Sequence, residues 1–155
     1  MELVAAATTR PRSLRSPGDR ARVTRDGLVA GAVAGAVSGL PSTIWELARG
    51  GDPLAATLAA GSMLLPAETR RSRLLAAAVP VHGAISLSWG VVLAHALPTR
   101  KTTAAGAAAG ILIAALDLGI AARTFPRIRA LPRGPQIADH IAFGTTVGWV
   151  LARRR

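Results

Sequence analysis

The sequence contains no cysteine and no tyrosine, and its 155 residues include only three tryptophans and two phenylalanines. Without cysteine the chain has no disulfide framework, no thiolate nucleophile and no thiolate metal ligand. The apolar residues are mostly Ala, Val, Leu and Gly, so a water-soluble globule would lack the bulky side chains that fill a core. Small side chains instead suit helices that pack closely in a lipid bilayer.

Acidic residues are also scarce, at eight against 19 basic ones, and the net charge is +11. Such an excess often indicates nucleic-acid binding, because Lys and Arg neutralise phosphates. Here the basic residues flank apolar runs, which is typical of the loops of membrane proteins. We therefore expect the lipid bilayer as the partner, and no nucleic acid.

Residues 1–25 mix Arg, Ser, Thr, Pro and Gly without helical or strand periodicity, and six of them are Arg. These like charges would repel one another in any compact form. The sequence predicts a disordered basic arm over 1–25 and one helical membrane domain over 26–155.

Four apolar segments predict helices that cross a bilayer. A segment of 21 residues, such as the first, spans roughly 31 Å at the helical rise. The fourth has 17 residues and lies near the lower limit. The expected fold class is all-α, a polytopic membrane helix bundle. The predicted spans are 27–47, 74–97, 102–122 and 136–152.

A shorter apolar segment lies between Pro53 and Pro66. As a helix it would extend only about 20 Å, so 53–66 is expected to be interfacial or re-entrant, with a fifth span as the alternative. With four spans, 11 basic residues face the side of the arm and eight face the other side; with five spans the counts are 13 and six. Both put the N-terminus in the cytoplasm of a multi-pass protein of the cell (inner) membrane.

Glycines recur every fourth residue in three of the four spans, a spacing that lets a neighbouring backbone approach. In the first span Pro41 removes a helical hydrogen bond, which predicts a kink there. Gly27 begins the series in that span. The other glycines expected in helix packing are Gly31, Gly35, Gly39, Gly106, Gly110, Gly144 and Gly148.

Four polar residues fall in the outer half of the predicted bundle, namely His82, Asp117, Asp139 and His140. Ionisable groups inside a bilayer are costly, roughly 3 kcal/mol each on insertion scales, so they face the interior and pair. They are a candidate intramembrane cluster, either a structural pairing or a proton or metal pathway. At least one carboxylate is expected within hydrogen-bond reach of an imidazole.

Motifs with known chemistry are missing. No span carries an HxxxH or HxxE pair, so any metal site would have to be assembled between helices. A GxSxG turn and a phosphate-binding loop are also missing. We therefore expect neither an enzyme nor a bound cofactor.

The run AGAVAGAVSGLPSTIWELARGGDPLAATLAAG is followed by VHGAISLSWG, LDLG, FPRIRALP and PQIADHIAFG. Over residues 27–152 this pattern resembles a group of small membrane proteins of high-GC bacteria whose function is unknown. The resemblance implies a multi-span membrane protein and no particular site residue.

Two hypotheses about function follow. The first is a non-enzymatic membrane protein that packs through its glycine faces with a second copy or with another membrane protein. The alternative is a small transporter or proton or metal-ion pathway built on the His and Asp residues. They are distinguished by geometry, because a pathway requires His82 and Asp117 to converge on one cavity.

Overall fold

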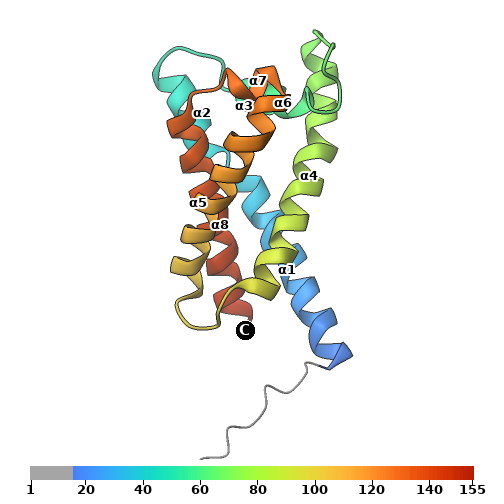
Figure 1. The fold of residues 1–155 in the computed structure, drawn as a ribbon, viewed down its shortest axis with the longest axis vertical. Helices are drawn as coiled ribbons and strands as arrows, with labels where there is room; N and C mark the ends of the chain where they lie inside the picture. Colours follow the sequence, from blue (N-terminus) through green and yellow to red (C-terminus); the bar gives the residue numbers. More distant parts are fainter. Residues whose placement is uncertain (1–15) are drawn as a thin grey trace, which may run out of the picture.

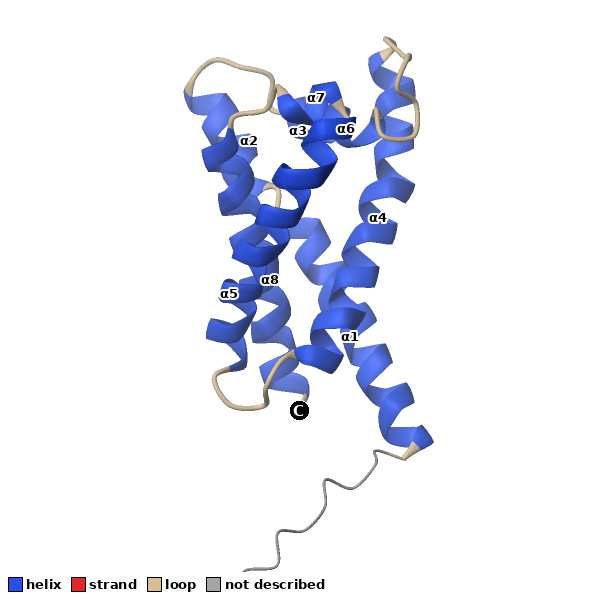
Figure 2. Ribbon diagram, in the orientation of Figure 1, coloured by secondary structure: helices blue, strands red, loops and turns tan. Residues whose placement is uncertain are grey.

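The computed structural model describes residues 16–155, and every regular element in that range is a helix (Figures 1 and 2). The all-α class predicted from the sequence is confirmed. The elements are α1 (Pro17–Val37), α2 (Leu40–Ala48), α3 (Ala55–Gly61), α4 (Arg71–Ala96), α5 (Thr102–Leu116), the π-helical turn η1 (Asp117–Ala121), α6 (Ala122–Thr124), α7 (Pro126–Arg129) and α8 (Arg133–Arg154).

Three helical stretches are long and apolar enough to cross a membrane: Pro17–Ala48, Arg71–Ala96 and Thr102–Thr124. They contain the first three predicted spans. The fourth, 136–152, lies in α8, which has 22 residues but is not among the three. Its length suffices, but the polar residues of its first half lower its mean hydropathy. The length and hydropathy of the helices therefore support three membrane spans and do not confirm the fourth.

The first helix begins well before the predicted span. α1 begins at Pro17, and the hydroxyl of Ser16 accepts a hydrogen bond from the amide of Asp19 (3.1 Å). Serine at the N-cap, proline in the first turn and an acidic residue in the same turn stabilise a helix start. The prediction of disorder was therefore wrong for 17–25, while 1–15 lie outside the described residues.

The first predicted span is interrupted. α1 ends at Val37 and α2 begins at Leu40, so Ser38 and Gly39 lie outside both helices. Pro41, in the first turn of α2, has no amide hydrogen to continue the α1 ladder. The expected kink is therefore a two-residue interruption within the spanning stretch Pro17–Ala48.

The segment 53–66 is less helical than expected. Only Ala55–Gly61 forms a helix, α3, which is too short to cross a membrane. Gly61 lies against α4, where a Cβ atom would come within 2.0 Å of the carbonyl oxygen of Leu74. The close approach of α3 to α4 therefore depends on a glycine at this position.

Glycines bring α1 and α4 into backbone contact. A Cβ on Gly31 would lie 2.4 Å from the carbonyl oxygen of Ser86, and one on Gly90 would lie 2.4 Å from that of Gly27. Gly35 contacts the side chain of Ser86. The expected packing role is borne out at these positions, but not at Gly39, which has no atom within 4 Å of a Cβ position.

Close backbone contacts at glycines also join α5 to α8. A Cβ on Gly106 would lie 2.2 Å from the carbonyl oxygen of Gly144, and one on Gly110 would lie 2.3 Å from that of His140. Gly148 faces the carbonyl oxygen of Thr102 at 2.5 Å. The bundle therefore consists of two close pairs, α1 with α4 and α5 with α8.

The two pairs meet along a seam between α1 and α8, where small and branched side chains such as Ala30, Ala34, Val147 and Leu151 are fully buried. The seam ends near the C-terminus, where Nε of Arg154 donates to Oδ1 of Asp26 at 2.9 Å. Asp26 is only 6% exposed.

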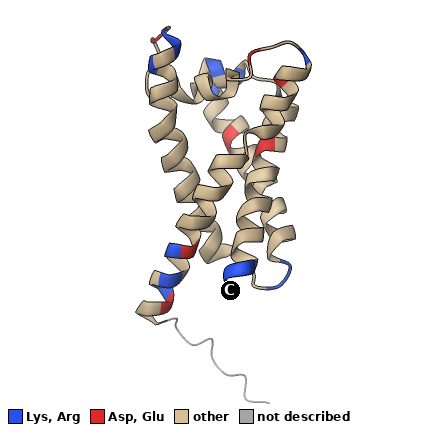
Figure 3. Ribbon diagram, turned by 180° about the vertical axis from the view of Figure 1, so that it is seen from behind, with Lys and Arg blue, Asp and Glu red and all other residues tan. Residues whose placement is uncertain are grey.

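Lys and Arg gather at the two ends of the bundle (Figure 3). At the end away from the N-terminal end of α1, the guanidinium of Arg71 binds both carboxylate oxygens of Asp52. In the same region Arg73 pairs with Glu68 at 3.1 Å, and Arg127 donates to the Glu68 carbonyl oxygen at 2.9 Å. These contacts tie the connections on either side of α3 to α4 and α7.

The Asp52 pair predicts a small loss of stability in acid. The hydrogen bonds from Arg71, and then from the amide of Leu54, hold the pKa of the Asp52 carboxyl below its usual value. A carboxyl whose pKa is lower in the folded state stabilises the fold above its unfolded pKa of about 3.9, and this contribution is lost as the pH falls through the folded pKa.

We expect the melting temperature in detergent to fall less between pH 6 and pH 3 in Asp52→Asn than in the parent chain. Arg71→Gln is the matched control, because it removes the same contact from the other side. A parent-like fall in both variants would contradict the assignment.

Candidate functional site

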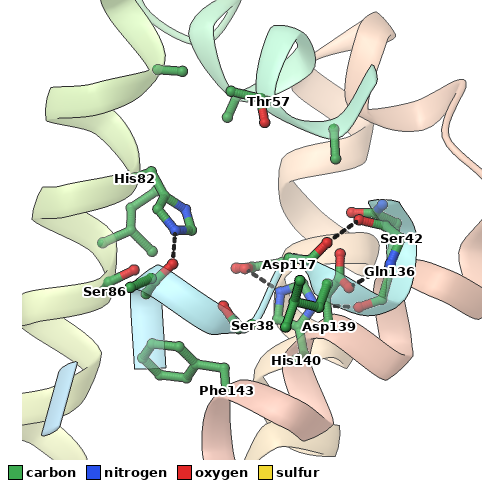
Figure 4. A pocket seen from close by; sticks show the side chains of 18 of the residues that line it. Ser38, Ser42, Thr57, His82, Ser86, Asp117, Gln136, Asp139, His140 and Phe143 are labelled. Carbon is green, nitrogen blue, oxygen red and sulfur yellow. Dashed lines mark hydrogen bonds and ion pairs between the residues drawn. The ribbon is translucent and has the colours of Figure 1, made fainter. Parts of the chain in front are cut away.

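A cavity of about 450 Å³ lies between the two helix pairs, in the half of the bundle away from the N-terminal end of α1 (Figure 4). Its walls come from the break between α1 and α2, from α3 and α4, from the start of η1 and from α8. The polar residues that line it are Ser38, Ser42, Thr43, Thr57, His82, Ser86, Asp117, Gln136, Asp139 and His140.

Asp117 and His140 form a direct contact across the α5 and α8 pair. Nε2 of His140 lies 2.9 Å from Oδ2 of Asp117, and Nδ1 lies 2.7 Å from the carbonyl oxygen of Gln136 (Figure 4). The expected contact between a carboxylate and an imidazole is confirmed here.

The carbonyl oxygen of Gln136 and the carboxylate oxygen of Asp117 determine where the imidazole of His140 carries hydrogen. A carbonyl oxygen only accepts, so Nδ1 of His140 carries a hydrogen. Nε2 then either donates to the Asp117 carboxylate, as part of an imidazolium, or accepts from a protonated Asp117. In both cases one dissociable proton is shared between the two side chains.

A π-helical turn begins at Asp117. In an α-helix with one wider turn the side chains shift around the axis, and such turns are frequent at functional sites. The side chain of Asp117 is 39% exposed and that of His140 is 20% exposed. The pair is therefore accessible from the cavity instead of sealed in the core.

Asp139 makes a different contact. Its Oδ1 accepts a hydrogen bond from the amide of Ser42 at 2.9 Å (Figure 4). Ser42 lies in the first turn of α2, whose amides have no partner within the helix. A carboxylate from α8 thus caps α2, and it replaces the N-cap side chain that Gly39 lacks.

His82 binds the other side of the helix break. Its Nε2 lies 2.8 Å from the carbonyl oxygen of Gly35, which belongs to the last turn of α1. Because that oxygen only accepts, Nε2 carries a hydrogen and donates it to Gly35. Ser86 and Trp89, four and seven positions after His82 on the same face of α4, line the same cavity.

The structure brings all four predicted polar residues to one cavity, but not into one cluster of contacts. His82 bonds to the backbone instead of to either carboxylate. Over residues 16–155 no group of three His, Asp or Glu side chains is placed to hold a metal ion. The cavity is therefore a polar chamber with separate acid and imidazole groups.

Two other ionisable residues of the predicted spans, Glu46 and His95, lie outside this set. Glu46 is not among the residues that line the cavity. His95 lies near the N-terminal end of α1, where its Nε2 is 3.1 Å from Oγ1 of Thr24. The residues that sequence analysis missed are Ser38, Ser42 and Gln136, whose positions depend on the helix break and on which helices face one another.

The cavity ends where the packed core begins. Ile113 and Phe143 line the cavity and also belong to the buried core between the two pairs. Beyond them the core continues through Ala34, Leu93 and Val147. The cavity is therefore blocked by packed side chains on the side of Asp26.

Comparisons of this chain with protein-family models, with curated proteins and with solved structures find no match. Fold and site together define a helical bundle in which three helices are able to cross a membrane and a polar cavity lies between two glycine-packed pairs.

Proposed function

We propose that the chain is an integral membrane protein of the cell (inner) membrane, with α8 as a fourth span and the N-terminus in the cytoplasm, and that its cavity is a proton-linked site for a small solute. The observation that carries the proposal is the convergence of His82, Asp117, Asp139 and His140 on one cavity that is blocked on one side. It favours a transporter over a purely structural protein.

Irregular helix geometry supports this assignment. The break between α1 and α2 lines the cavity through Ser38 and Gly39, and the π-helical turn starts at Asp117. Pro80, inside α4, lies two residues before His82. Secondary transporters typically form their substrate and ion sites where spanning helices are discontinuous.

The shared proton of Asp117 and His140 is the chemical basis of the proposal. If the pair loses that proton, the contact keeps a single negative charge inside a bilayer, which is disfavoured unless a cation or a new proton replaces it. Occupancy of the cavity by a solute and protonation of the pair would therefore be coupled.

A metal-ion pathway has less support, because no three ligand side chains come together among the residues that the structure describes. A packing role also has less support. The glycines at 27, 31, 90, 106, 110, 144 and 148 contact helices of the same chain. The glycine faces are therefore covered by helices of the same chain, and a second copy or another membrane protein would have to bind a different face.

The test is proton flux into liposomes that contain the purified chain and a pH-sensitive dye, driven by a potassium diffusion potential. We expect proton uptake above that of empty vesicles, and at least a tenfold lower rate in Asp117→Asn, whose amide cannot release a proton. Glu46→Gln is the control, because it removes a carboxylate that does not line the cavity.

Equal flux in the parent and in Asp117→Asn would overturn the proton-linked role, and so would flux no greater than that of empty vesicles at several imposed potentials. The latter result, with the chain correctly inserted, would favour the structural role instead.

A further inference from the structure

A second hollow lies on the outer surface of the α5 and α8 pair. Its volume is about 480 Å³, and its apolar wall comes from α5, η1 and the start of α8. Three arginines line its end, from α6, α7 and α8. The residues that line it are Ile111, Ala114, Ala115, Leu118, Gly119, Ala122, Arg123, Arg129, Arg133 and Ile137.

The three arginines lack partners within the described part of the chain. Arg123, Arg129 and Arg133 are exposed, and their guanidinium groups form neither an ion pair nor a hydrogen bond with residues 16–155. Other arginines at this end are engaged, as in the contacts of Arg71 with Asp52 and of Arg127 with Glu68. Three positive charges thus converge on one hollow without a counter-charge from the protein.

The apolar wall continues from these charges toward the middle of the bundle. Ile111 lies 12 positions before Arg123, which corresponds to roughly 18 Å along a helix. Ile111 is 53% exposed and Ile137 is 38% exposed. A ligand that fills the hollow would therefore meet positive charge at one end and an apolar surface along the rest.

We propose that this hollow binds one anionic phospholipid, whose phosphate is held by Arg123, Arg129 and Arg133 and one of whose acyl chains lies along Ile111, Leu118 and Ile137. Arginine binds phosphate oxygens with charge-assisted, bidentate hydrogen bonds. Basic pockets between spanning helices bind anionic headgroups by the same chemistry. The inference rests on the membrane placement proposed above, but not on the proton-linked role.

The experiment is native mass spectrometry of the full chain in detergent, titrated with phosphatidylglycerol, with phosphatidylcholine and with free glycerol phosphate. Arg123→Gln/Arg133→Gln should lower retention of phosphatidylglycerol by at least about fivefold, because each arginine near a lipid surface contributes substantial attraction. Arg49→Gln/Arg70→Gln is the matched control, since it removes two charges from the same end but none from the hollow.

A third variant separates a lipid from a free phosphate. A Cβ on Gly119, which lines the hollow, would meet no atom within 4 Å, so we expect the side chain of Gly119→Phe to enter the hollow. It should reduce retention of phosphatidylglycerol at least about fivefold and leave glycerol phosphate unaffected.

The two paired variants give clear outcomes. Equal losses in the Arg123/Arg133 and Arg49/Arg70 variants would overturn the proposal. So would binding of glycerol phosphate as strong as that of the lipid, with no effect of Gly119→Phe, because the hollow would then be a site for a free anion. Neither outcome bears on proton uptake, which depends on Asp117 in the other cavity.

Discussion

Gly144→Ala should destabilise the chain by about 3 kcal/mol, at the upper end of the range for overpacked positions. The new Cβ would lie 2.1 Å from the carbonyl oxygen of Gly106 and 2.8 Å from the amide nitrogen of Gly110. Both are backbone atoms, so no side-chain rotation relieves the clash and the two helices must separate. Thermal unfolding in detergent measures the effect.

Gly119→Ala is the matched control, because it makes the same substitution in η1, on the partner helical stretch, where a Cβ would enter open space. It should leave the melting temperature unchanged or raise it slightly, since alanine favours helix over glycine. Equal melting temperatures of the two variants would show that α5 and α8 are not held together by the contact at Gly144.

Arg154→Ala should cost about 2 kcal/mol, somewhat less than a fully buried pair because the arginine side chain is 35% exposed. The loss comes from Asp26, whose side chain is only 8% exposed and whose carboxyl group would be left without a partner. SDS-induced unfolding of the folded chain in mixed micelles measures the change in free energy.

The neighbouring residue is the control. Arg153 lies over the ring of Trp149 at 4.3 Å and makes no contact with Asp26, so Arg153→Ala should cost less than about 1 kcal/mol. The double variant Asp26→Ala/Arg154→Ala should recover part of the loss, because it removes the unpaired charge. A double variant less stable than Arg154→Ala would contradict the buried-pair explanation.

The sequence predicted the helices and their packing surfaces well, because both depend on local patterns. Long apolar runs require helices in a bilayer, and glycine at every fourth position leaves one face without side chains. The pairing itself was not predictable. Spacing indicates that Gly106 and Gly144 face a helix, but not that each faces the other.

Helix boundaries were less predictable. Pro41 indicated a disturbance, but a kink and a break begin with the same missing hydrogen bond. Whether the helix bends or is interrupted depends on new partners for the freed backbone groups. These partners come from α4 and α8: His82 binds the Gly35 carbonyl oxygen, and Asp139 binds the Ser42 amide. The start of α1 was also missed, although Ser16, Pro17 and Asp19 form an N-terminal capping pattern.

The candidate site was predicted in its membership but not in its contacts. Depth along the spans placed His82, Asp117, Asp139 and His140 at one level, and the structure gives them one cavity. Which imidazole meets which carboxylate depends on helix rotation and on the π-helical turn at Asp117. Neither follows from a single sequence.

The arrangement in pairs also determines where the molecule can change shape. Within each pair the backbones touch at glycines, which leaves little room for sliding. Between the pairs, the seam is tied by Asp26 with Arg154 at one end and by Asp139 with Ser42 at the other. Of these two contacts, only that between Asp139 and Ser42 borders the cavity. If the Asp139 carboxylate left the Ser42 amide, one helix pair would be free to rotate against the other about the contact at Asp26.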